Sequence, residues 1–102
     1  MKVIEEMKNK VNKKVKSILD LVMEINNIEG YDAFFNYSGH VDSIEVRVQE
    51  NHDYHKEGVF KTYIEDSRVY LNDDFYIYTD NRLELLDNLQ KKLSNFLDKI
   101  NN

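Results

Sequence analysis

Three histidines and one carboxylate form the only grouping in this chain that resembles a metal site. His52-Asp53-Tyr54-His55 lies in a polar stretch, and His40 lies on the preceding turn. Neutral imidazole and carboxylate groups are good ligands for divalent cations. Their spacing matches no recognised zinc signature, however, and on a loop His52 and His55 need not point the same way. Because solvated histidines are the default on polar loops, we expect neither a metal nor a cofactor.

Ser38-Gly39-His40 places a hydroxyl beside an imidazole, which are two of the groups used in nucleophilic catalysis. An attacking serine also needs a base within hydrogen-bond reach, a third group that orients the base, and an oxyanion site. Adjacent turn residues do not supply that geometry. Carboxylates could act as an acid/base pair only if burial or coupling shifted their pKa values, and the isolated glycines form no phosphate-binding loop. We therefore predict that the protein is not an enzyme.

Charge is sorted along the chain. Residues 1–16 carry six lysines against two glutamates, whereas residues 17–90 carry sixteen carboxylates against five cations, and the net charge is −5. The lysines could neutralise phosphates, but no arginine lies among them and no aromatic residue is interleaved for base stacking. An acidic body is also repelled by nucleic acid. We therefore expect no direct nucleic-acid binding, and the sorted charge indicates a protein partner.

The acidic residues fall mostly at predicted strand ends and loops. A rim of this kind can occupy a cationic groove by the same electrostatics as nucleic acid, while ordinary solubility is the alternative explanation of surface carboxylates. Tyrosine, of which the chain has seven, is enriched where proteins meet. The predicted partner-binding residues are Asp42, Glu50, Asp53, Tyr54, Glu57, Glu65, Asp66, Tyr70, Asp73 and Asp74.

Two helices are predicted from apolar residues that recur at spacings of three and four. The first spans about 2–28 and carries Ile4, Met7, Val11, Val15, Ile18, Val22 and Ile25, with Gly30 as its C-terminal cap. Their average spacing of about 3.5 residues is the coiled-coil period, so this stripe fits either burial against a sheet or self-association. The second follows a cap at Asp80 or Asn81, and its inward face is Leu83, Leu86, Leu89, Leu93, Phe96 and Ile100, widened by Leu85 and Leu97.

Strands are predicted between the two helices. Residues 44–49 alternate apolar and polar side chains, which is typical of a half-buried antiparallel strand. The expected strands, in chain order, are 31–38, 44–49, 59–65 and a short hairpin of 68–71 with 75–78. We therefore expect one α+β domain over 1–102, in which an antiparallel meander of three to five strands carries both helices on one face.

Composition also predicts where the protein works. The chain contains no cysteine, which fits a reducing compartment. It has no apolar region of the kind that a signal peptide needs, and no run approaches the roughly 20 apolar residues that span a bilayer. We expect a cytoplasmic protein that has no membrane partner.

Residues 34–48, FFNYSGHVDSIEVRV, resemble small proteins of phages and integrative elements of Gram-positive bacteria. The order of the predicted elements is similar to that of compact acidic anti-CRISPR proteins, some of which insert a helix and a three-stranded sheet into the nucleic-acid groove of a type II CRISPR nuclease. No motif residue can be transferred, and the lysine-rich first helix departs from a uniformly acidic mimic. The resemblance implies an inhibitor that binds the basic groove of a host protein such as a CRISPR nuclease. The alternative is a structural or regulatory homo-oligomer, for instance a homodimer, assembled through the N-terminal helix.

Overall fold

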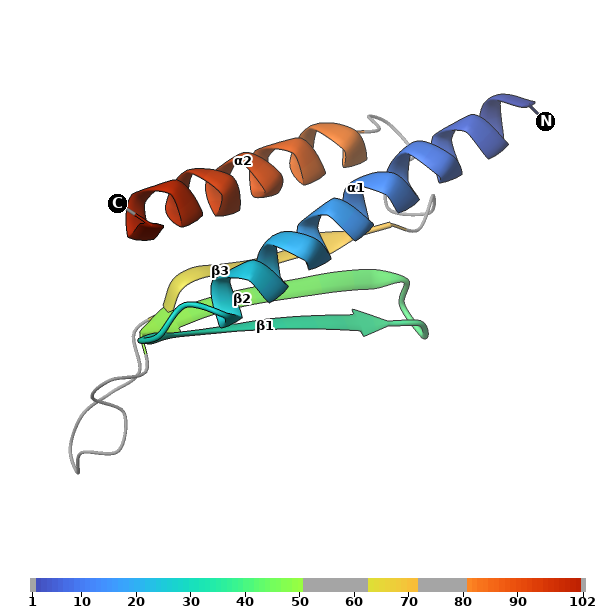
Figure 1. Cartoon of the computed structure of the whole chain (residues 1–102). Coiled ribbons are helices and arrows are strands. Elements are labelled where there is room, and N and C mark those ends of the chain that lie inside the picture. The colour runs from blue at the N-terminus through green and yellow to red at the C-terminus, as the bar shows by residue number, and fades with distance from the viewer. Residues whose placement is uncertain (1, 51–62, 72–80, 102) are drawn as a thin grey trace.

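The computed structural model describes residues 2–50, 63–71 and 81–101 of the chain. Its elements, in chain order, are α1 (Lys2–Asn26), β1 (Tyr31–Ser38), β2 (Ser43–Glu50), β3 (Tyr63–Tyr70) and α2 (Arg82–Asn101). The strands form one antiparallel sheet in the order β1-β2-β3, and the two helices lie side by side over the same face of it (Figure 1). This arrangement confirms the predicted α+β class. Within the described residues, neither helix has the length and apolarity needed to cross a membrane.

Helix α1 packs on the sheet through its apolar stripe. Four members of the predicted stripe are buried, namely Val11, Ile18, Val22 and Ile25. The sequence allowed two explanations of this stripe, burial against the sheet and self-association. In the structure these four residues are buried in the core. The helix ends at Asn26, two residues before the predicted boundary, and a turn leads into β1. Gly30 lies in that turn with a φ of 99°, a left-handed conformation that glycine adopts without steric cost.

Strand β2 is the centre of the sheet and supplies much of its apolar face. Ile44, Val46 and Val48 are fully buried under the helices, as the alternating pattern predicts. Val46 lies opposite Phe35 of β1 and Ser67 of β3, which fixes the register on both sides. Side chains at the intervening positions of β2 point to the other face, which neither helix covers.

The third strand differs from its prediction. The sequence pattern divided this region into a strand at 59–65 and a hairpin that began at 68, but Tyr63–Tyr70 is one continuous strand paired with β2. The polar run Glu65-Asp66-Ser67-Arg68 reads as a break between strands. It is tolerated in a strand because Asp66 and Arg68 form ion pairs with residues of β2. Residues 59–62 and 75–78 lie outside the described part of the chain.

Helix α2 completes the core. The amide of Leu85 donates a hydrogen bond to the carbonyl of Asn81 (2.9 Å), so the helix starts beside one of the two predicted caps. Three predicted inward residues are buried, namely Leu86, Leu89 and Leu93. Leu97 packs partly buried against the core, but Leu85 is 37% exposed, so the prediction that Leu85 widens the inward face is wrong. It projects instead beside the edge of β3, where the helix overhangs the sheet.

Candidate protein-binding site

The face of the sheet that the helices leave uncovered carries a strip of alternating charges. Glu45 forms ion pairs with Arg68 and with Arg47, the latter at 2.9 Å, and Arg47 also approaches Asp66 at 3.5 Å. The register causes this pattern, because Glu45 lies opposite Arg68 and Arg47 lies opposite Asp66. The hydrogen bond from Arg68 holds the pKa of Glu45 below its ordinary value, and the same bond raises the pKa of Arg68. Both shifts favour the charged forms of Glu45 and Arg68.

An aromatic side chain lies next to this strip. Phe34 of β1 is opposite Arg47 of β2, and it is 47% exposed. Asn36 lies opposite Glu45 on the same face. We call the side chains of Phe34, Asn36, Glu45, Arg47, Asp66 and Arg68 the open face. It combines one exposed ring with paired charges, which is a composition found at protein interfaces, where aromatic residues and arginine are enriched.

Two of the predicted acidic residues lie at opposite ends of the sheet. Asp42 is in the turn between β1 and β2, where its Oδ1 accepts a hydrogen bond from the hydroxyl of Tyr37 at 2.7 Å. That bond, as its largest cause, raises the pKa of Tyr37 above its ordinary value. Glu50 ends β2 at the other side, opposite Tyr31. A strand of this length separates the two carboxylates by about 25 Å, so they do not share one small site.

The predicted residues of β3 divide between the two faces of the sheet. Glu65 points toward the helices, where Lys92 of α2 lies 4.0 Å away, and its carboxylate accepts a hydrogen bond from Ser67. Asp66 belongs to the open face. Tyr70 ends the strand opposite Ser43, and its hydrogen bond with Arg68 helps to raise the pKa of that guanidinium.

The structure therefore does not gather the described members of the predicted set into one negative surface. Asp42, Glu65 and Asp66 each have a hydrogen-bond or ion-pair partner. The remaining predicted residues, Asp53, Tyr54, Glu57, Asp73 and Asp74, lie outside the described residues, as do His52 and His55. The predicted partner-binding set did not include Phe34, Arg47 or Arg68. The alternation of residues 44–49 already placed Arg47 on the side away from the core, which is the signal that could have found it.

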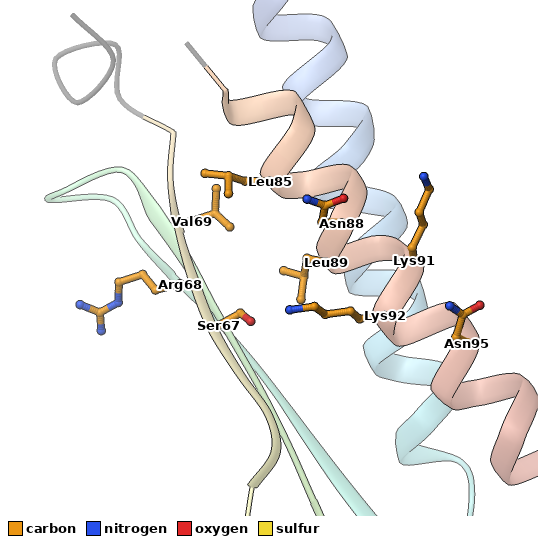
Figure 2. A pocket seen from close by; sticks show the side chains of 9 residues that line it. All are labelled: Ser67, Arg68, Val69, Leu85, Asn88, Leu89, Lys91, Lys92 and Asn95. Atoms are coloured by element: carbon orange, nitrogen blue, oxygen red, sulfur yellow. The ribbon is translucent and has the colours of Figure 1, made fainter. Parts of the chain in front are cut away.

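A groove lies between β3 and α2, with a volume of about 480 Å³ (Figure 2). Val69, Leu85 and Leu89 point into it, and Lys92 extends across it toward Ser67. Figure 2 shows Lys91 and Arg68 directed away from the groove. Among the described residues that line it there is no carboxylate and no histidine, so these residues offer neither a carboxylate acid/base pair nor imidazole ligands for a metal.

The described parts of the chain also lack a cluster of metal ligands. They contain no group of three or more His, Cys, Asp or Glu side chains able to hold a metal ion. Ser38 ends β1 and His40 lies in the following turn, and neither shares a hollow with a buried acidic partner. The best candidate for a functional site is therefore the open face.

Comparisons with protein-family models, with curated proteins and with solved structures find no match for this chain.

Proposed function

We propose that this protein is a non-enzymatic, phage-type inhibitor that binds a host protein through the open face of its sheet. The observation that supports this proposal is that both helices cover the same face of the sheet (Figure 1). The other face carries the exposed ring of Phe34 beside four paired charges.

Interfaces obtain most of their binding energy from a few central residues, commonly aromatic residues and arginine. Phe34 is suited to be such an anchor because it is already desolvated on one side by the neighbouring strand. Arg47 and Arg68 are held in place by Glu45 before binding. Their side-chain entropy is therefore partly lost in the free protein, which lowers the entropic cost of association.

The partner class follows from charge. The chain has a net charge of −5, and its acidic residues are concentrated between residues 17 and 90. This negative field steers the protein toward a basic groove on a host protein and speeds association even where individual carboxylates are paired. A CRISPR nuclease is the particular host factor suggested by the resemblance of residues 34–48 and by the order of elements.

The proposal is tested by binding of the purified protein to a type II CRISPR nuclease, alone and with its guide RNA, followed by a DNA-cleavage assay. We expect binding that weakens as salt is raised, and inhibition of cleavage. Phe34→Ala should weaken binding by about 30-fold, which corresponds to an anchor worth ~2 kcal/mol. Asp66→Lys should mainly slow association.

Leu85→Ala is the matched control, because it truncates an apolar side chain of similar exposure on the other side of the molecule. Equal affinity of the Phe34→Ala and Leu85→Ala proteins would refute the open face as the interface. Absence of binding to the nuclease in every state would refute that partner. Affinity capture from a Gram-positive host lysate by wild type, but not by Phe34→Ala, would then identify another one.

The alternative function, a homo-oligomer joined by the apolar stripe of α1, has less support. Val11, Ile18, Val22 and Ile25 are already in the core. Assembly through them would require the helix to leave the sheet, which would expose the apolar faces of both.

A further inference from the structure

The two edges of the sheet are protected to different degrees. Strand β3 carries Glu65, Asp66 and Arg68, and its pairing with β2 is irregular at Val48/Gln49. Strand β1 has Asp32 as its single charged residue and contains no lysine and no proline. Natural sheets prevent unwanted strand pairing by placing charges, prolines or bulges on their edges. By this criterion β1 is the edge open to pairing.

One residue of the β1 edge is already occupied by a side chain from α1. The Asn26 amide donates from Nδ2 to the carbonyl of Ala33 and accepts at Oδ1 from the amide of Ala33, both at 2.7 Å. The backbone groups of Ala33 therefore point away from β2. Because these directions alternate along an antiparallel strand, the N–H and C=O groups of Phe35 and Tyr37 point to the same edge. Among the described residues, no strand pairs with β1 on this side.

Helix α1 crosses the sheet obliquely, and this leaves space next to Tyr37. Its last residue, Asn26, lies at the edge of β1. Its first half borders a hollow of about 440 Å³, which Val11, Leu71 and Arg82 line. Tyr37 borders the same hollow and is 53% exposed. The helix thus overhangs the edge near Ala33 and leaves it clear near Tyr37.

Two exposed apolar side chains occupy the overhanging part of the helix. Leu19 and Met23 are 36% and 59% exposed. They share a helix face with Asn26 and Asn12, by spacings of three, four and seven residues. Asn26 contacts β1, and Asn12 borders the hollow at Tyr37, so this helix face is directed toward the β1 side of the sheet.

We propose that two copies of the chain pair antiparallel through their β1 edges, with Phe35 of each copy opposite the partner's Tyr37. Since Asn26 occupies Ala33, Phe35 and Tyr37 are the two consecutive edge-facing residues that follow it in β1, and this register uses the backbone groups of both residues in both copies. It also keeps the side chains of both residues on the helix side of the sheet. The partner's Ala33 then falls opposite Gly39, beyond the end of β1, so that Asn26 keeps its hydrogen bonds.

A second copy fits this edge because, under a two-fold axis, the exposed side chains of one copy meet complementary side chains of the other. The axis passes through Asn36, and it brings the overhanging Met23 of one copy to the exposed Tyr37 of the other, twice. Residues 33–38 carry no charge, so the paired strands bring no like charges together. The two three-stranded sheets would then form one continuous sheet, and the open faces of the two copies would lie side by side on it.

Single-cysteine cross-linking tests the pairing directly, because the natural sequence has no cysteine. In the proposed register Asn36 lies opposite the partner's Asn36 in a pair without mutual backbone bonds, with Cα atoms about 4.5 Å apart, a distance that permits a disulfide. Asn36→Cys should therefore form an interchain disulfide roughly tenfold faster or more than the control Asn88→Cys on α2, through proximity alone. Equal rates for the two variants would overturn the proposal.

Analytical ultracentrifugation of the wild-type protein provides the second measurement. We expect a concentration-dependent monomer–dimer equilibrium that Met23→Glu weakens by roughly tenfold or more and that Leu85→Glu leaves unchanged. Raising the salt should strengthen this association, because it screens the repulsion between two acidic chains. A protein that stays monomeric at every concentration, or loss of the dimer in Leu85→Glu, would contradict the proposal. Salt has the opposite effect on the proposed inhibitor binding, so failure of one proposal is distinguishable from failure of the other.

Discussion

Replacement of Asn26 is the sharpest test of how this fold is held together. The Asn26 side chain joins the end of α1 to β1 by one donated and one accepted hydrogen bond, both 2.7 Å long. Ala33 is only 6% exposed, so its backbone groups depend on this amide. Asn26→Ala removes both bonds at once, and because Asn26 itself is exposed the change creates no cavity.

The magnitude follows from the two bonds. Each contributes about 1 kcal/mol net, and alanine returns up to ~0.7 kcal/mol through its better helix propensity, so we expect a loss of roughly 1–2 kcal/mol. For a domain of this size that loss lowers the melting temperature by about 4–16 °C. Urea unfolding followed by circular dichroism gives the free energy of unfolding directly, with an unchanged dependence on denaturant.

Asn9→Ala is the matched control, because Asn9 is an exposed asparagine of the same helix. It makes the same chemical change and receives the same gain in helix propensity. We expect this variant to be as stable as wild type or slightly more stable. If Asn26→Ala lay within about 0.5 kcal/mol of Asn9→Ala, the two hydrogen bonds to Ala33 would not hold the edge, and the register argued for the dimer would lose its basis.

Three further results are expected. Because Arg68 lowers the pKa of Glu45, the Glu45 carboxylate stabilises the fold at neutral pH, and this effect is lost as the pH falls through its folded-state pKa, below the ordinary value of 4.5. Urea unfolding at each pH should therefore show Glu45→Gln to be less stable than wild type at neutral pH and equally stable in acid. A stability difference that does not change with pH would contradict this. Leu86→Ala should lower the free energy of unfolding by about 2–5 kcal/mol because the Leu86 side chain is fully buried, whereas Leu85→Ala on the exposed side should lower it by under about 1 kcal/mol. Similar losses in the two variants would contradict the orientation of α2. Gly30→Ala should cost about 1–2 kcal/mol, since no atom lies within 4 Å of the added Cβ and the loss arises from the positive φ alone; an unchanged stability would show that the turn relaxes.

The open face also explains why charge counted along the sequence overstates the negative surface. Residues 17–90 hold sixteen carboxylates against five cations. Yet two of those cations, Arg47 and Arg68, lie among the carboxylates Glu45 and Asp66 on one face. Exposed pairs of this kind contribute only ~0–1 kcal/mol each to stability. They convert part of an acidic surface into a neutral one of alternating charges.

The sequence by itself determined those helices and strands in which buried residues recur at a regular spacing. The stripe of α1, the inward leucines of α2 and the alternation of β2 repeat with the periods of a helix or a strand, so each could be predicted without knowledge of its neighbours. Strand β3 could not, because its central residues are polar and their partners lie on β2. The pair of Arg68 with Glu45 joins residues 23 positions apart, and only the register of the sheet brings them together.

Tertiary structure alone decided which surfaces remain for partners. No sequence pattern predicted that the side chain of Asn26 would form hydrogen bonds with the edge of β1. This contact depends on the chain reversing direction at residues 27–30. The acidic residues were visible from the start, but their pairing, and the exposure of Phe34, depend on which strands become neighbours and which face the helices cover. Local patterns specify what is buried within one element, whereas the uncovered surface is set by contacts between elements far apart in the chain.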